Sequence, residues 1–267
     1  MIVWDLFGGG QNSVWKALQE TTLEDSIYTF DITPKQHENQ HYIDLAKEPQ
    51  ELIEWFKQFP KPNLITASPL CQSFSIILSM RGGGTAGWKI NGDGSISLRT
   101  KEDFELNKHG FTKNIKYEKA NFIAKLGERC LLNTIRLIEY FQPKYWYIEN
   151  PGTSLMWRYT KHNLGLKNVF YNFARYGAYG YPINKYTCFL SNVELDLKKD
   201  YLKGTYDNLE ANCFRAKKME LMSGKRIYKK PTTLTTLQIQ EGNPSSKIPE
   251  ELIWEIIQQW MKNWIGE

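Results

Sequence analysis

The sequence contains little cysteine, and no apolar run in it is long. Its four cysteines, Cys71, Cys130, Cys188 and Cys213, lie far apart and form no CxxC pair. This spacing argues against a disulfide scaffold, a zinc site or another metal site, and is typical of reduced thiols. No stretch could span a bilayer, and the chain starts at Met1 without a basic or apolar leader, so we expect a cytoplasmic protein.

Low-complexity tracts and internal repeats are also missing, and the composition is that of a folded globular chain. Hydrophobic residues make up 41% and charged residues 24% of the 267 residues, which suits one well-cored domain with a small appendage. The net charge is +5, but residues 198–230 alone hold ten Lys/Arg and four Asp/Glu. Such a stretch would attract a phosphate backbone; the alternative interpretation is a solvated surface.

Short apolar runs alternate with amphipathic segments, which predicts an α/β fold with βαβ units and a parallel sheet. We expect a first helix capped by Asn12 or Ser13, and a long helix closed by Pro143. The expected strands cover residues 2–7, 26–32, 41–45, 63–68, 145–149, 169–174 and 187–191, and the other expected helices cover residues 49–59, 118–141 and 249–264.

Residues 81–116 interrupt this alternation. They are rich in Gly, Lys, Asn and Thr and show little periodicity. Because glycine favours backbone freedom, we expect a long mobile loop here, which is either functional or a disordered insertion.

Unusual residues gather where the expected strands end, which is where ligands bind in open α/β sheets. Asp5 and a glycine run, Gly8 to Gly10, close the first strand, and Asp31 closes the second, where a ribose diol would lie. These features suit NAD, S-adenosylmethionine or a plain tight turn. A nicotinamide-dependent dehydrogenase is disfavoured, because a full GxGxxG is missing.

A cysteine and a glutamate follow two later strands. Cys71 comes after Ser68-Pro69-Leu70 and before polar residues, which favours a reactive, partly exposed thiolate over a small buried side chain. Glu149 ends the strand after the long helix, where a general acid, a cap or an ion pair are the alternatives.

Five segments, in this order, resemble the cytosine-C5 DNA methyltransferase family, and specifically its short bacteriophage-type branch with ENP in place of ENV. They are Asp5-Leu6-Phe7-Gly8-Gly9, Ser68-Pro69-Leu70-Cys71-Gln72-Ser73-Phe74-Ser75, Glu149-Asn150-Pro151, Tyr179-Gly180-Tyr181-Pro182-Ile183-Asn184-Lys185 and Ile248-Pro249-Glu250-Glu251-Leu252-Ile253.

The resemblance implies a Rossmann-like S-adenosylmethionine-dependent methyltransferase sheet. Residues 1–191 and 241–267 would form the catalytic domain, and residues 192–240 a small basic target-recognition region. The implied cofactor is S-adenosyl-L-methionine, and the implied partner is double-stranded DNA, bound by a monomer. Restriction–modification and phage self-protection are roles that such an enzyme serves.

The resemblance also assigns the chemistry to particular residues. Cys71 would add to carbon 6 of a flipped cytosine, Glu149 would assist at N3, Lys185 would support the pocket, and residues 76–116 would close over the base. The implied cofactor-binding residues are Asp5, Phe7, Gly8, Gly9, Asp31, Asp44, Ser68 and Pro69. The implied nucleic-acid-binding residues are Gln72, Ser73, Arg81, Lys198, Lys199, Lys217, Lys218, Lys225 and Arg226.

Several positions depart from the family pattern or stay open. Gln11 and Leu70 replace a glycine and a proline, and Thr187 stands where many relatives have an arginine that holds cytosine O2. Asp44 would reach the adenine amino group or cap the following helix. An RNA cytosine-C5 methyltransferase and a catalytically silent nucleic-acid-binding protein are the alternative functions.

Overall fold

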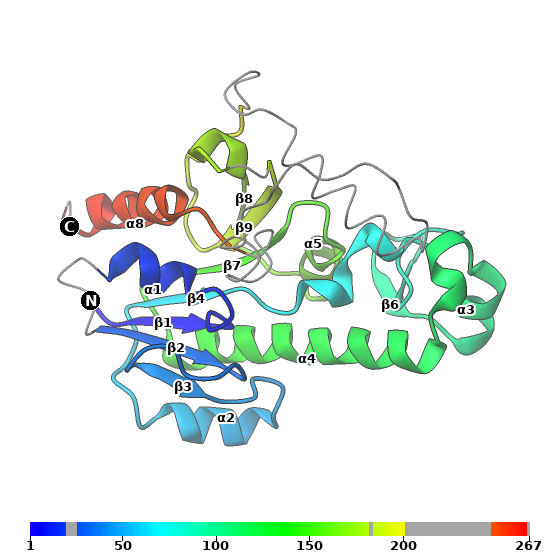
Figure 1. Ribbon diagram of the computed structural model, residues 1–267, viewed down its shortest axis with the longest axis horizontal. Coiled ribbons are helices and arrows are strands. Elements are labelled where there is room, and N and C mark those ends of the chain that lie inside the picture. Colours follow the sequence, from blue (N-terminus) through cyan, green and yellow to red (C-terminus); the bar gives the residue numbers. More distant parts are fainter. Residues whose placement is uncertain (20–25, 182–183, 201–246, 266–267) are drawn as a thin grey trace, which may run out of the picture.

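A seven-stranded mixed sheet forms the centre of the structure, a computed structural model that describes residues 1–19, 26–181, 184–200 and 247–265 (Figure 1). The strand order is β3-β2-β1-β4-β7-β9-β8, and β9 runs antiparallel to both of its neighbours, while the other paired strands are parallel. The strands are β1 Val3–Leu6, β2 Ile27–Asp31, β3 Gln40–Tyr42, β4 Leu64–Ala67, β7 Tyr145–Pro151, β8 Phe170–Arg175 and β9 Tyr186–Ser191. The predicted Rossmann-like α/β fold is therefore confirmed.

Helices cover both faces of the sheet, because successive side chains of a strand point to opposite sides. Trp4 packs on the face that carries α2 (Pro49–Phe56) and α4 (Tyr117–Phe141), against Phe56 and Phe141. Val3 belongs to the other core, with α1 (Ser13–Leu18) and α8 (Glu250–Ile265). Figure 1 shows the two helix pairs on opposite sides of the sheet.

Most predicted elements occur within a few residues of their expected ends. The helix predicted for residues 49–59 stops at Phe56, because Pro60 disfavours helical backbone at Phe59. Asn12 precedes α1 as predicted, but its side chain makes no cap hydrogen bond, and its backbone is left-handed with φ 49°. No described helix is long and apolar enough to cross a membrane.

The prediction of a long irregular loop at residues 81–116 is wrong. The segment folds into a hairpin of β5 (Trp88–Ile90) and β6 (Ile96–Leu98), followed by α3 (Lys101–Asn107) and a 3-10 turn at Gly110–Asn114. Its glycines make turns: Gly84 has φ +85°, and a Cβ there would lie 2.1 Å from Trp88 O. We call residues 80–116 the hairpin unit.

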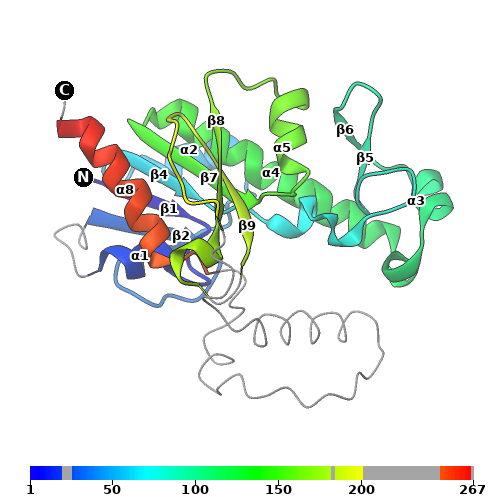
Figure 2. The same ribbon diagram turned by 90° about the horizontal axis from the view of Figure 1, so that it is seen from above.

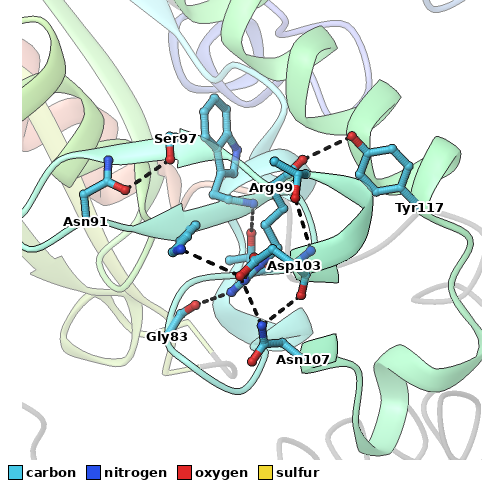
Figure 3. A network of polar contacts seen from close by, with 11 residues as sticks. Gly83, Asn91, Ser97, Arg99, Asp103, Asn107 and Tyr117 are labelled. Atoms are coloured by element: carbon cyan, nitrogen blue, oxygen red, sulfur yellow. Dashed lines mark hydrogen bonds and ion pairs between the residues drawn. The ribbon is translucent and has the colours of Figure 1, made fainter. Parts of the chain in front are cut away.

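A buried arginine holds the hairpin unit together (Figure 3). Arg99 is 3% exposed, and its Nε donates to Thr85 O at 2.7 Å. The other guanidinium nitrogens donate to Gly83 O and to the Asp103 carboxylate. The Tyr117 hydroxyl donates to Arg99 O at 3.1 Å and so ties the unit to the start of α4. One side chain thus joins the first turn of the unit to α3.

The hairpin unit lies at the end of α4 that is farther from the sheet (Figures 1 and 2). Gly87 lets it approach the helix closely, since a Cβ there would lie 2.5 Å from the Ala124 Cβ. Trp88 is 1% exposed and stacks on Phe74, with ring centroids 5.4 Å apart. The unit is therefore packed against the segment that follows Cys71.

Part of the predicted target-recognition region packs in the core beside α8. Leu195 and Leu197 are buried in the core that contains α8. The Arg175 backbone N–H donates to Lys198 O at 3.1 Å. Residues 201–246 lie outside the described residues, so the predicted division at residues 192–240 stays a prediction.

Candidate active site

The residues singled out at strand ends meet along one edge of the sheet. Within the parallel sheet, Leu6 pairs with Phe30 and Ala67, and Ala67 pairs with Ile148. The chain after each of these positions therefore leaves the sheet on the same side. This edge brings together the glycine turn, the Cys71 segment and Glu149.

The glycine turn after β1 surrounds a buried carboxyl group. Asp5 is 4% exposed, and its Oδ1 accepts from Thr66 Oγ1 at 2.7 Å. Its Oδ2 is buried and has no hydrogen-bond partner among the described residues. A Cβ on Gly8 would lie 1.8 Å from that oxygen, so only glycine fits there.

Burial also controls the charge of this group. It raises the pKa of Asp5 to about 7, with a further increase from the nearby Asp31 and an opposing effect of the Thr66 hydrogen bond. Asp5 can therefore change its protonation near neutral pH. A ligand that brings a donor or a positive charge to Oδ2 would favour the ionised form.

Asp31 supports the same turn from the neighbouring strand. Its Oδ2 accepts from the Gly9 N–H at 3.1 Å, and its Oδ1 accepts from the Thr33 N–H at 3.0 Å. A Cβ on Gly9 would lie 2.3 Å from Thr33 Oγ1. Asp31 is only half-buried, so its carboxylate keeps acceptor capacity toward the outside.

Phe7 and Asp44 lie on either side of this region. Phe7 is half-buried, with φ 64°, and its N–H donates to Phe30 O at 2.8 Å. Asp44 is exposed and accepts from the Ala46 N–H at 2.9 Å, and it does not cap α2, which has no side-chain cap. Its contact with adenine stays a prediction.

The Cys71 segment is fastened to the end of β7. The Ser68 N–H donates to Leu6 O at 3.2 Å, and Asn150 Nδ2 donates to Pro69 O at 3.0 Å. Cys71 follows two residues later, at the start of a 3-10 turn, Cys71–Phe74, and is exposed. The hydrogen bond from Asn150 thus links this turn to the residue next to Glu149.

Helix α4 supports the same turn from below. Ser73 is buried, and its hydroxyl donates to Leu70 O at 2.6 Å. A Cβ on Gly127 would lie 1.6 Å from Ser73 Oγ, so glycine at this position lets the helix approach. Gln72 is exposed beside Cys71.

Glu149 lies in a cluster of hydrogen-bond donors from β9, from Lys185 just before it and from the 3-10 turn Tyr176–Tyr179. Its Oε1 accepts from Thr187 Oγ1 at 2.6 Å, from Lys185 Nζ at 2.9 Å and from the Tyr176 hydroxyl at 3.3 Å. Glu149 is 5% exposed and Thr187 is fully buried. Three donors therefore orient one oxygen of the carboxyl group and leave Oε2 without a contact from Thr187, Lys185 or Tyr176.

Three further pKa shifts, of Tyr176, Cys130 and Cys188, distinguish donors and thiols near the site. Burial and the neighbouring Glu149 carboxylate raise the pKa of Tyr176 well above its usual value, so its phenol stays a donor. Burial raises the pKa of Cys130 to about 12 and that of Cys188 further still. Exposed Cys71 is thus better suited to nucleophilic chemistry than either buried thiol.

The predicted nucleic-acid-binding residues are spread over several elements. Arg81 is exposed on the hairpin unit, and Lys199 is exposed after β9. Lys198 lies over the Tyr179 ring, and its Nζ is 3.7 Å from Glu255 Oε2. Lys217, Lys218, Lys225 and Arg226 lie outside the described residues. DNA contacts by these residues and by Gln72 and Ser73 stay predictions.

Sequence reasoning did not give a role to Asn150, Tyr176 or Thr66. Asn150 belongs to the Glu149-Asn150-Pro151 segment, and a polar side chain at a strand end could have indicated its role. Tyr176 and Thr66 gave none, because their contacts with Glu149 and Asp5 join residues 27 and 61 positions apart.

Comparisons with known proteins give structural similarity only. No protein-family model matches the chain, and no curated protein sequence does. A putative DNA modification methyltransferase encoded within an E. coli prophage is 14% identical over 79% of this chain and 53% of its own, with a TM-score of 0.39. S. pombe Dnmt2 methyltransferase is 13% identical over 79% and 59%, with a TM-score of 0.43.

The methyltransferase EhMeth of Entamoeba histolytica is 15% identical over 75% of this chain and 57% of its own, with a TM-score of 0.41. The chain thus spans just over half the length of these solved structures. Their TM-scores are too low to support a function, so the proposal below rests on the motifs and the geometry of the site.

Proposed function

We propose that this protein is a DNA cytosine-C5 methyltransferase that uses S-adenosylmethionine, with Cys71 as the nucleophile. The observation that carries the proposal is the hydrogen bond from Asn150 to Pro69 O. It fastens the segment with an exposed thiol to the strand end that carries a buried, multiply hydrogen-bonded glutamate. A nucleophile and a carboxyl group at one sheet edge are what addition to a cytosine ring requires.

Cys71 makes carbon 5 reactive. Its thiolate forms a bond to carbon 6, and the electron pair of the C5–C6 double bond becomes available at carbon 5 to take the methyl group. Water then takes the proton from carbon 5, and the bond between sulfur and carbon 6 breaks as the double bond returns and the thiolate leaves. The target cytosine has to leave the stack before the thiolate can reach it.

Glu149 acts at N3 of the same ring. Its Oε1 is held by Thr187, Lys185 and Tyr176, so we assign Oε2 to N3. A proton on Oε2 donated to N3 relieves the charge that thiolate addition places on the ring. Lys185 would also cover part of the role of the arginine with which many family members hold cytosine O2.

The glycine turn fits S-adenosylmethionine. Asp5 Oδ2 is a buried acceptor without a partner among the described residues, and Gly8 and Gly9 let the turn pack closely around Asp5 and Thr33, where any side chain would collide. When bound, the cofactor supplies an activated methyl group on a sulfonium. Asp5 would favour its positive charge, Asp31 its ribose hydroxyls, and Phe7 would pack on it, with Asp44, Ser68 and Pro69 at the periphery.

The test is methyl transfer from labelled S-adenosylmethionine to mixed duplex DNA, with matched RNA as a second substrate and bisulfite sequencing to locate the product. We expect 5-methylcytosine in DNA, and transfer to RNA alone would contradict the DNA assignment. Duplex containing 5-fluorocytosine should trap a covalent adduct with the wild type and not with Cys71→Ser. Cys130→Ala is the matched control, because that thiol is buried, and an adduct in Cys71→Ser would show that another residue is the nucleophile.

A further inference from the structure

A cavity opens beside the Cys71 turn, outside the cluster around Glu149. It has a volume of about 550 Å³ and lies between the segment after Cys71, the turn at Thr85–Gly87 and the start of α4. Neither Glu149, Lys185 nor Asp5 lines it. Its volume is in the range of small-ligand sites, and it exists only because residues 80–116 form a folded unit.

The wall of this cavity is mainly aliphatic with two amide groups. Ile77 and Leu78 face it from the Cys71 side, and Ile123 from α4. Gln72 and Asn114 also line it, and neither amide takes part in a hydrogen bond within the described chain. Apolar surface with free amide donors and acceptors suits a flat heterocycle, since Asn and Gln can pair with base edges.

Two lysines give the cavity a positive charge. Lys116 and Lys119 line it, are exposed, and form no ion pair with any described residue. The nearby Lys101, by contrast, lies 3.4 Å from Glu118. Unpaired ammonium groups beside an apolar wall match a nucleotide, whose base is apolar on its faces and whose phosphate is anionic.

We propose that this cavity binds one unstacked nucleotide of the polynucleotide substrate, next in the strand to the base held at Cys71. This proposal rests on the proposed function. The cavity wall begins at Gln72, one residue after the nucleophile, and neighbouring Cα atoms are about 3.8 Å apart. A nucleotide that flanks a base held at Cys71 is therefore within reach of the cavity, which we call the flanking-nucleotide cavity.

The experiment is photo-crosslinking of the full-length protein to a tetrathymidylate that carries one 4-thiothymidine, followed by mass spectrometry of the peptides. We expect crosslinks to residues 72–78 and 114–123. Ile123→Trp and Ile77→Trp fill the cavity from opposite walls, and each should lower the yield at these peptides about tenfold, the loss of one stacked base. Ile77 is 49% exposed, so its variant folds even if the other does not.

Lysine variants test the phosphate contact. Lys116→Ala and Lys119→Ala should each lower the salt dependence of oligonucleotide binding by about 0.7 in the log–log slope. Lys125→Ala is the matched control, because it changes an exposed lysine of the same helix that does not line the cavity. An equal change for Lys125→Ala would overturn the site, because it would indicate general charge attraction.

The design separates this proposal from the proposed function. The probe contains no cytosine and the reaction contains no cofactor, so a chain without methyl transfer activity still gives the crosslinks if the cavity binds nucleotides. Crosslinks confined to other peptides, or unchanged in both tryptophan variants, overturn the cavity and leave methyl transfer untouched.

Discussion

Replacing Thr187 with valine removes one hydroxyl group and keeps nearly the same side-chain shape. In the structure this hydroxyl donates to Glu149 Oε1 at 2.6 Å, and both residues are buried. The substitution therefore tests whether the Thr187 hydroxyl orients the Glu149 carboxyl group. Thr187→Ser keeps the hydroxyl and serves as the control.

The size of the effect follows from the type of contact. A hydrogen bond to a charged group is worth about 1.5–3 kcal/mol, which corresponds to roughly a 10- to 150-fold change in rate if it acts fully in the transition state. Lys185 and Tyr176 remain on the same oxygen. We therefore expect the lower end, about a tenfold decrease in the rate of methyl transfer.

The measurement is single-turnover methyl transfer at saturating cofactor and DNA, with cofactor binding measured separately. Thr187→Val should slow transfer and leave cofactor affinity unchanged, and Thr187→Ser should restore most of the rate. A valine variant that transfers methyl groups at the wild-type rate would refute the role of the hydroxyl. A serine variant as slow as the valine variant would point to packing instead.

Three other predictions follow from the described contacts. The pKa of Asp5 is raised to about 7 in the folded state, so its contribution to stability is present at low pH and is lost as the pH rises from about 4 to about 7. Over that interval, Asp5→Asn should become stabilising relative to the wild type, as measured by denaturant titrations. Gly127→Ala should slow adduct formation with 5-fluorocytosine DNA, because its Cβ collides with the Cys71 turn, whereas Gly92→Ala, with no atom within 4 Å, should be neutral. Arg99→Met should lower the local stability of the hairpin unit, measured by hydrogen exchange, by about 3–5 kcal/mol. Lys101→Ala removes an exposed ion pair and should lower it by less than about 1 kcal/mol. Equal effects of the two substitutions would contradict the central role of the buried arginine.

The sheet and its helices were predictable because local hydrophobic patterns determine where each strand and helix lies. Trp4 and Val3 alternate between two cores, and α4 has a regular apolar face, so period and length were enough. The hairpin unit was missed because its order comes from Arg99, which joins Gly83 to Asp103 across 20 residues that show little periodicity. The glycines of this segment, which were interpreted as signs of mobility, form the turns that the Arg99 side chain holds together.

The site residues also fall into those that local sequence patterns indicate and those that only the tertiary structure reveals. The glycine turn, Asp31, Cys71 and Glu149 were visible as unusual residues at strand ends, and the structure brings them to one edge. Thr187 was noticed only as a missing arginine, since its value depends on the register that places it opposite Pro151, beside Glu149. Pairing of this kind is set by tertiary structure and has no local signal.

The antiparallel strand β9 has a consequence for how the chain can vary. It starts at the edge that carries Cys71 and Glu149 and ends at the opposite edge. Residues 192–198 then return to the first edge, where Lys198 O accepts from the Arg175 N–H at the end of β8. The chain returns to the described fold near Ile248, whose N–H donates to Ser13 Oγ at the start of α1. Whatever joins residue 200 to residue 247 thus leaves and returns at the edge that carries Cys71 and Glu149, and no strand pairing among the described residues depends on the intervening sequence.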